Sequence, residues 1–222
     1  MPKIHAIEPR WGPKDGNTWV QVWGENFLNF GDNTVCNFGT QSVLAEYHSS
    51  TYITCYSPKS DVTEKPIPFS ISLNRQQATQ DTVDFWYYNN PQVAELEPNQ
   101  GPVGGGNDVI IKGSNFNPFN FTNSIDISNS TFCNFEGINT RVRAYSLNST
   151  KLRCVAPPSY ILDHAIVEVT LNNQQFTDDN AVYWYYKPPE VYDAEPKEGP
   201  TVGGTNVTVF GSNFKIDKKI IC

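Results

Sequence analysis

Residues 4–27 read IHAIEPRWGPKDGNTWVQVWGENF, and the same pattern returns twice further along the chain. The second copy spans residues 93–116 (VAELEPNQGPVGGGNDVIIKGSNF), and the third spans residues 191–214 (VYDAEPKEGPTVGGTNVTVFGSNF). Each copy holds Glu-Pro, then Gly-Pro, then an alternating apolar run and finally Gly-x-Asn-Phe, with the same spacing between these parts. The fixed spacing predicts that one backbone path is used three times.

The copies recur at an interval of roughly 90 to 100 residues, the length of one immunoglobulin-type sandwich and enough to enclose a hydrophobic core. Residues 18–23 alternate with the period of a half-buried strand. Further short runs at residues 42–47, 52–56, 69–73 and 83–88 are separated by turn-forming residues, and no stretch has a helical pattern. We therefore predict an all-β fold of tandem immunoglobulin-like (E-set) β-sandwich domains placed end to end.

The three copies also predict domain boundaries. Residues 1–90 are expected to form the first domain, residues 91–188 the second and residues 189–222 the N-terminal part of a truncated third, called the first, second and third repeats below. An inserted loop at residues 117–132 of the second repeat is rich in Asn, Ser, Thr and Phe, a composition typical of a surface loop or an extended hairpin. Prolines directly follow the closing strands, so stiff linkers are expected to fix neighbouring domains relative to one another.

The chain of 222 residues is acidic, with a formal net charge of −7. An acidic chain has no electrostatic attraction for nucleic acid or for anionic membranes. No apolar stretch reaches the roughly 18 residues that indicate a membrane span. We therefore expect no nucleic-acid partner and no direct membrane contact within this segment, and we expect any signal, anchor or tail to lie outside it.

Four cysteines occupy matched positions in the first two repeats, as Cys36 and Cys55 and as Cys133 and Cys154. One disulfide in each repeat is the better interpretation, and each would close a loop of roughly 20 residues and stabilise its domain by roughly 3 kcal/mol. Zinc binding is the alternative, but it favours closer cysteine pairs or histidines, and the three histidines neither cluster nor recur. Cys222 falls where a first cysteine belongs in the third repeat, so its partner is expected outside the chain.

Sequons for N-linked glycosylation occur at Asn120, Asn129, Asn148 and Asn206. The alternative is that some of them arise by chance in a chain rich in Asn. Two lie in the inserted loop, where a glycan can be accommodated, whereas Asn206 is expected in a strand and must point outward to be modified. Because disulfides and N-glycans both form in the secretory pathway, an extracellular or cell-surface location is predicted.

The shared pattern, completed by Cys-x-Phe, Leu-Asn-x-Gln and an aromatic closing strand before Pro-x-Val, resembles the IPT/TIG family of immunoglobulin-like domains. The resemblance covers essentially the whole chain and implies the fold, but it implies little about function. Members of the family occur in plexin-like and growth-factor-receptor ectodomains, in other surface proteins, in intracellular transcription factors and in starch-acting enzymes. The resemblance also implies that Gly-Pro and the glycines after it provide positive φ where the chain turns into the first long strand. It assigns the closing Phe of each block to the core (Phe27, Phe116 and Phe214).

The closing strands carry two tryptophans at equivalent positions, Trp86 and Trp184. Alternation places Phe85 and Tyr87 on the core face, so Trp86 and Tyr88 are predicted on the outer face, with Trp184 likewise outward in the second repeat. Near a domain junction such tryptophans either pack on a neighbouring loop or domain, or contact a partner protein or a glycan.

Other signals point to turns rather than to sites. Residues 101–106 superficially resemble a phosphate-binding loop, but they lack Gly-Lys-Ser/Thr and no helix follows. Residues 178–180 (Asp-Asp-Asn) lack the spacing of a calcium loop. No nucleophile, base or carboxylate pair recurs at matched positions. We expect no catalytic residue, no metal and no cofactor, and hence no enzyme.

Three functions from different classes remain open. The favoured one is a non-enzymatic extracellular array for cell-surface adhesion or recognition, or the rigid stalk or filament of a surface glycoprotein, with other proteins or further copies of its own repeats as partners. Carbohydrate-binding accessory domains of an enzyme are the first alternative, with the outward tryptophans stacking on sugar. A DNA-binding regulator is the second, and the acidic charge and the sequons argue against it.

Overall fold

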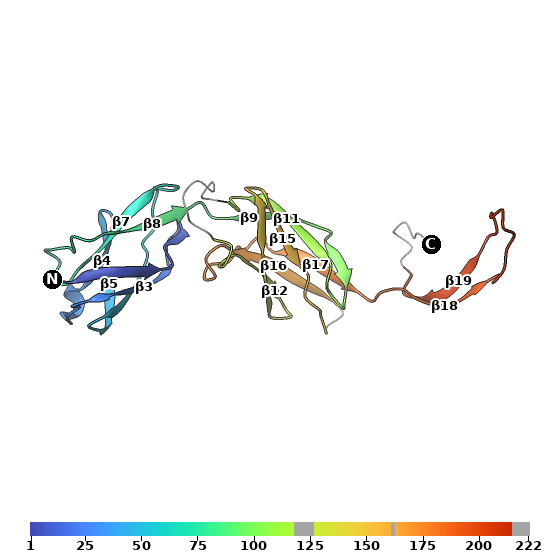
Figure 1. The fold of residues 1–222 in the computed structure, drawn as a ribbon, viewed down its shortest axis with the longest axis horizontal. Helices are drawn as coiled ribbons and strands as arrows, with labels where there is room; N and C mark the ends of the chain where they lie inside the picture. Colours follow the sequence, from blue (N-terminus) through green and yellow to red (C-terminus); the bar gives the residue numbers. More distant parts are fainter. Residues whose placement is uncertain (118–126, 161–162, 215–222) are drawn as a thin grey trace.

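The computed structural model describes residues 1–117, 127–160 and 163–214. Within these ranges the chain is nearly all β-structure, and the one helical element is the 3-10 turn η1 (Gly31–Asn33). The three repeats follow one another along the long axis of the molecule, from the blue first repeat to the red third repeat (Figure 1). The predicted class of tandem immunoglobulin-like domains is thus confirmed. No helix in the described ranges is long and apolar enough to cross a membrane.

The first repeat forms a sandwich from one eight-stranded sheet whose order is β1-β3-β6-β5-β4-β7-β8-β2. The long strand β5 connects the two layers, because its first half pairs with β4 and its second half pairs with β6. The strands are β1 (Lys3–Glu8), β2 (Trp11–Pro13), β3 (Trp19–Glu25), β4 (Val35–Phe38), β5 (Gln41–Ser49), β6 (Tyr52–Tyr56), β7 (Pro66–Ser72) and β8 (Val83–Tyr88).

The second repeat has the same path in two separate sheets, ordered β10-β17-β16-β12-β13 and β14-β15-β11-β9. Here the counterpart of β5 is split into β13 and β14 by Ala144, which is fully buried. The strands are β9 (Gln92–Glu97), β10 (Gln100–Pro102), β11 (Asp108–Ser114), β12 (Phe132–Glu136), β13 (Thr140–Arg143), β14 (Tyr145–Asn148), β15 (Lys151–Val155), β16 (His164–Thr170) and β17 (Ala181–Tyr186).

The third repeat contributes the antiparallel pair β18 (Glu190–Glu195) and β19 (Thr208–Ser212). The pairing repeats that of β1 with β3 and of β9 with β11. In all three pairs the first residue of the sequence motif lies opposite the Gly of Gly-x-Asn-Phe, as the pairs Ile4–Gly24, Val93–Gly113 and Val191–Gly211 show.

Each residue of the Gly-x-Asn-Phe motif is required for a different physical reason. A Cβ on Gly113 would collide with the main-chain oxygen of Gln92 and with the ring of Phe116, and the first and third repeats have the same arrangement. The Asn has positive φ of 60° to 61° in all three copies, which Asn tolerates better than most residues. Its side chain donates a hydrogen bond to the main-chain oxygen three residues before the start of the motif, for example from Asn115 Nδ2 to the Asn90 carbonyl at 2.8 Å. In the first two repeats the Phe is buried in the core.

The cores lie between the layers of each sandwich. Phe27 and Phe116 are fully buried, whereas Phe214 in the third repeat is 37% exposed. On β8 both Phe85 and Tyr87 are fully buried, as the alternation predicts. The cores therefore have the composition and the faces that the sequence pattern indicates.

The Gly-Pro glycines are needed for a reason other than positive φ. Gly12 and Gly101 lie in β2 and β10, and a Cβ there would collide with the side chain of Thr18 or with the hydroxyl of Tyr183. Positive φ appears further along, for example at Gly105 (65°). The expected positive φ is thus found at the glycines that follow Gly-Pro, whereas Gly12 and Gly101 are glycines because close packing excludes a side chain at these positions.

Candidate functional site

The first and second repeats meet through one turn of the second repeat, residues 171–175, which lies on the end of the first repeat. The turn follows β16 and reads Leu-Asn-Asn-Gln-Gln. Asn172 shapes it, because its Oδ1 accepts hydrogen bonds from the main-chain N–H groups of Gln174 (3.1 Å) and Gln175 (3.2 Å). The two glutamine side chains are thereby directed at the first repeat.

Gln174 pairs with the main chain of Trp19 at the start of β3. Its Oε1 accepts from the Trp19 N–H at 2.8 Å, and its Nε2 donates to the Trp19 carbonyl at 3.0 Å. The pairing of β1 with β3 ends where Glu8 lies opposite Gln21, so β1 does not cover the edge of β3 at Trp19. The Gln174 amide therefore continues the hydrogen-bond ladder where the neighbouring strand stops.

Gln175 extends the contact into a polar network. Its Nε2 donates to the Asn17 carbonyl at 2.7 Å, and its Oε1 accepts from Thr18 Oγ1 at 3.2 Å and from Asn172 Nδ2 at 2.6 Å. Thr18 is fully buried, and its hydroxyl also accepts from Asn172 Nδ2 at 3.4 Å. Buried polar groups that satisfy one another fix a single geometry, because each broken bond leaves a donor or acceptor without water.

Two aromatic side chains of the first repeat lie at the same junction, one half-buried (Trp11) and one buried (Tyr88). Trp11 packs against the core cluster of the second repeat and donates its Nε1 hydrogen to the Leu171 carbonyl at 3.2 Å. Tyr88, the last residue of β8, is 1% exposed and belongs to the core cluster of the second repeat. Burial raises the pKa of the Tyr88 hydroxyl. The prediction that Tyr88 lies on the outer face holds for the first core only, because the side chain is buried in the next one.

The linker is tied to both repeats. Asn90 Nδ2 donates to the Asp15 carboxylate, while the Asn90 carbonyl accepts from Asn115 Nδ2. Just beyond, the Val93 N–H donates to Asp179 Oδ2 at 2.6 Å. These bonds hold the short connection at both of its ends.

The far end of the second repeat presents different chemistry from the far end of the first. Asn107 stands in place of Thr18, and it exchanges hydrogen bonds with the Tyr183 hydroxyl at 2.8 and 3.0 Å. Gln100 stands in place of Trp11, because Gln100 lies opposite Trp184 on β17 just as Trp11 lies opposite Trp86 on β8. Asp108 stands in place of Trp19. Of the first two repeats, only the first therefore has the surface that binds the Gln-Gln turn.

The predicted tryptophan sites differ in exposure. Trp184 is 50% exposed, and its ring lies 5.0 Å from that of His164 on the neighbouring strand. Trp86 is half-buried, with Trp11 and Pro66 opposite it on the flanking strands. Of the two, Trp184 presents more of its ring to solvent.

The cysteines of the first two repeats are joined within each repeat. Cys36 on β4 is bonded to Cys55 on β6, and Cys133 on β12 to Cys154 on β15, with Cα–Cα distances of 6.5 and 6.6 Å. Each bond links the two layers of its sandwich across the core. Cys222 lies outside the described residues.

Three of the four sequon asparagines lie in the described ranges, and all three are exposed. Asn148 Oδ1 accepts from the N–H (2.8 Å) and hydroxyl (2.9 Å) of Thr150, and Asn129 Oδ1 accepts from Arg143 at 2.9 Å. The strand expected around Asn206 begins only at Thr208, so Asn206 precedes it. Asn120 lies outside the described residues.

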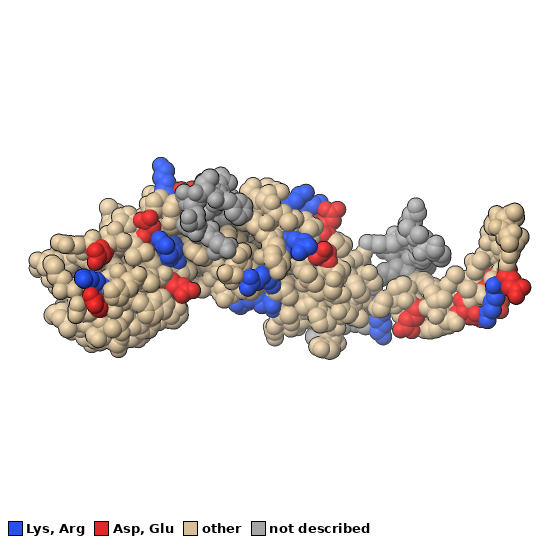
Figure 2. Space-filling model, in the orientation of Figure 1, with Lys and Arg blue, Asp and Glu red and all other residues tan. Residues whose placement is uncertain are grey.

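Charge on the visible face is mixed, with acidic and basic side chains interspersed over both sandwiches (Figure 2).

Within the described ranges no group of three or more His, Cys, Asp or Glu is placed to hold a metal ion. Burial, followed by the nearby carboxylates of Glu136, Asp178 and Asp179, raises the pKa of Glu168. Asp179 of the Asp-Asp-Asn stretch accepts a hydrogen bond from the Val93 N–H near the start of β9.

Sequence reasoning missed the Gln-Gln turn as a contact site. The available signal is that residues 73–77 read Leu-Asn-Arg-Gln-Gln and residues 171–175 read Leu-Asn-Asn-Gln-Gln, so both glutamines recur at matched positions. Recurrence alone does not show whether a turn is solvated or docked. The partner residues on β2 and β3 do not recur, which concealed the pairing.

Comparisons with known proteins agree with this architecture. Mouse plexin-A4 (Mus musculus) is 25% identical over 237 aligned positions, which cover 97% of this chain but 12% of plexin-A4. A structure of the full extracellular region of plexin A4 superposes with a TM-score of 0.56 at 21% identity, covering 96% of this chain and 18% of that one. A second structure of that region gives a TM-score of 0.50 at 20% identity, covering 84% of this chain and 18% of that one. The two disulfides and the similarity to the plexin ectodomain support an extracellular or cell-surface location.

The family model for the IPT/TIG domain matches residues 2–87, 91–185 and 189–221, nearly the whole chain. The three matches follow the three copies of the sequence pattern. The chain therefore belongs to the IPT/TIG family.

Proposed function

We propose that these repeats act as a rigid, non-enzymatic extracellular array in cell-surface recognition or adhesion, in which each domain is held on the next. The family and the similarity to the plexin ectodomain support a non-enzymatic extracellular recognition module. The proposal includes domain boundaries at residues 90/91 and 188/189, with residues 189–222 as the start of a third domain. Other proteins, or further repeats of the same kind, are the proposed partners.

The observation that carries this proposal is the junction between the first two repeats. Six hydrogen bonds join residues 171–175 of the second repeat to the first repeat. Trp11 and Tyr88 add apolar burial on the same surface. Interdomain contacts with satisfied polar groups and a buried aromatic core restrict relative motion, whereas domains without such contacts are expected to move.

Small-angle X-ray scattering on the full chain tests the rigidity. The wild-type profile is expected to fit one extended arrangement of the first two repeats. The double variant Gln174→Ala/Gln175→Ala is expected to need a range of interdomain angles and to show a broader distance distribution. The matched control is Gln76→Ala/Gln77→Ala, the same pair on the free turn of the first repeat. A wild-type profile that already needs a range of interdomain angles would argue against a rigid array.

We further propose that partners contact the exposed Trp184, beside His164. Aromatic residues with one exposed face are common anchors in protein interfaces. Trp184→Ala is expected to weaken capture of a protein partner at least about tenfold, as a hot-spot residue does. Binding to a glycan array that is lost in Trp184→Ala would instead favour the carbohydrate-binding alternative.

We also propose that glycans occupy the exposed sequons and shield the sides of the array. Expression in a eukaryotic secretory host is expected to add mass that N-glycanase removes. Asn148→Gln should remove one glycan, because Asn148 is exposed on an edge strand. An unchanged mass in Asn148→Gln would exclude this sequon.

A further inference from the structure

We propose that residues 73–77 of the first repeat form a second docking turn, which binds the far end of another IPT/TIG domain. That domain would present the surface which the first repeat presents to the second. The inference rests on the proposed stacking function and extends it to a further partner domain. It is drawn from comparing residues 171–175, which dock on the first repeat, with the equivalent residues 73–77, whose two glutamines are exposed.

The two turns have the same local structure. Asn74 Oδ1 accepts hydrogen bonds from the main-chain N–H groups of Gln76 and Gln77, both at 3.0 Å, as Asn172 does in the docked turn. The residue after the asparagine has positive φ in both turns, 58° at Arg75 and 61° at Asn173. The shared geometry directs the two glutamines of each repeat the same way.

The one residue that differs between the turns points away from the docking face. Arg75 donates twice to the main-chain oxygen of Asp32, at 2.8 and 3.1 Å, within its own repeat. Its counterpart Asn173 accepts from Arg141, also within its own repeat. The change from Asn to Arg therefore leaves the docking chemistry of the turn intact.

The glutamines of the first repeat have the side-chain groups needed for docking. Gln76 and Gln77 are exposed, whereas Gln174 and Gln175 are half-buried at the junction. Among the described residues, the side-chain amides of Gln76 and Gln77 make no hydrogen bond.

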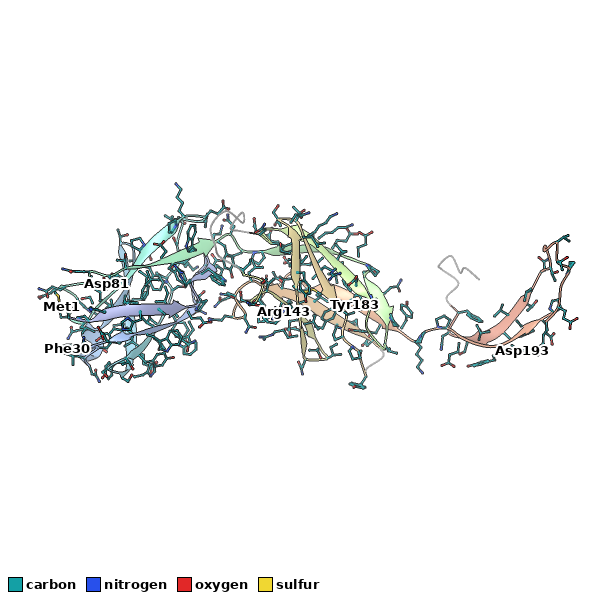
Figure 3. The ribbon with its side chains drawn as sticks, in the orientation of Figure 1. Met1, Phe30, Asp81, Arg143, Tyr183 and Asp193 are labelled. Atoms are coloured by element: carbon teal, nitrogen blue, oxygen red, sulfur yellow. A yellow bond between two sulfur atoms is a disulfide. The ribbon has the colours of Figure 1, made fainter. Side chains whose placement is uncertain are left out.

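A hollow of about 270 Å³ lies beside this turn, lined in part by Met1, Phe30, Leu73 and Gln77. Figure 3 shows Met1 and Phe30 together at the end of the first repeat that faces away from the second. Both are exposed apolar side chains, at 85% and 49%. Leu73 corresponds to Leu171, where the second repeat receives an aromatic side chain of its neighbour.

These features specify the partner. It must offer a strand start with uncovered main-chain N–H and C=O groups, an adjacent hydroxyl, and an aromatic side chain for the hollow, which are the roles of Trp19, Thr18 and Trp11 in the first repeat. The first two repeats of a second copy of this chain do not offer them, because that surface of the first repeat is already covered. The far end of its second repeat carries Asn107 and Asp108 instead.

A tandem protein tests the inference: residues 1–90 are joined directly to residues 2–222. Pro2 then follows Asn90, as Pro91 does in the native chain, so the native linker register is reproduced. An exposed Lys14→Arg change in the added copy marks its peptide by mass. Hydrogen exchange of the peptide containing Trp19 is measured separately in each copy.

We expect the Trp19 amide to be protected in both copies. Gln76→Ala/Gln77→Ala in the original first repeat should speed exchange in the added copy alone, by about tenfold, the effect of losing about one net hydrogen bond. Gln174→Ala/Gln175→Ala should speed it in the original copy alone. A fast Trp19 amide in the added copy, or one insensitive to Gln76 and Gln77, overturns this inference while the native junction stays protected. Fast exchange in both copies would overturn the proposed stacking function as well.

Discussion

At the scale of single residues, the identities in the repeated motif are determined by the packing of the fold and not by a catalytic or binding site. Gly113 is a glycine because the Gln92 carbonyl and the Phe116 ring leave no room for a side chain. Asn115 follows because it accepts positive φ and holds the main chain at Asn90. Each identity is therefore required by the pairing of the first strand of a repeat with its third.

Gly113→Ala is expected to lower the free energy of unfolding of the second repeat by about 2 kcal/mol, because the added methyl group must displace main chain. Gly104→Ala in the same repeat is the control, since a Cβ there meets open space. Urea unfolding of the full chain measures both. Equal midpoints for the two variants would contradict the packing explanation.

Glu168 predicts a pH dependence. Its pKa is raised in the folded state, first by burial and then by Glu136, Asp178 and Asp179. A folded pKa above the unfolded one means that stability from this group is present below the unfolded pKa and is lost as pH rises through the folded pKa. Glu168→Gln is therefore expected to stabilise the second repeat at pH 7, by less than about 1 kcal/mol.

The gain in Glu168→Gln should shrink toward pH 4, where the wild-type carboxyl is protonated. Thermal unfolding between pH 4 and pH 7 measures it, with the exposed Glu46→Gln in the first repeat as the control. A gain that is constant with pH would show that the charge of Glu168 is not its cause.

At the scale of strands and turns, the alternation of apolar and polar residues predicted the strands correctly. Residues 52–56 and 83–88 were expected as strands and are β6 and β8, because one face of each must be apolar. The docked turn was not predictable in this way. Residues 73–77 and 171–175 have nearly the same sequence and the same hydrogen bonds inside the turn, yet one is exposed and the other is docked, because that outcome depends on the neighbouring domain.

The disulfides act between elements, since each joins two strands in opposite layers. Cys36→Ala/Cys55→Ala is expected to lower the free energy of unfolding of the first repeat by about 3 kcal/mol, as expected for a loop of about 20 residues. The Cys133–Cys154 bond of the second repeat should stay intact in this variant. Denaturant unfolding measures the change, and a non-reducing mass that shows free thiols at Cys36 and Cys55 in the wild type would contradict it.

At the scale of the whole chain, the two sandwiches are not independent. Tyr88 belongs by sequence to the first repeat and by packing to the core of the second. The turn at residues 171–175 belongs to the second repeat and covers the edge of β3 in the first. Each repeat therefore completes part of the other, which a pattern read one repeat at a time does not show.

This reciprocity predicts coupled unfolding. An interface that exists only when both partners are folded stabilises each of them, so the first two repeats should unfold in one calorimetric transition in the wild type. Gln174→Ala/Gln175→Ala removes four of the crossing hydrogen bonds. At a net cost of about 1 kcal/mol each, their loss should separate the transition into two. Gln76→Ala/Gln77→Ala changes the same residues on the free turn and should leave the single transition unchanged. Two transitions already present in the wild type would show that the junction positions the repeats without coupling their stability.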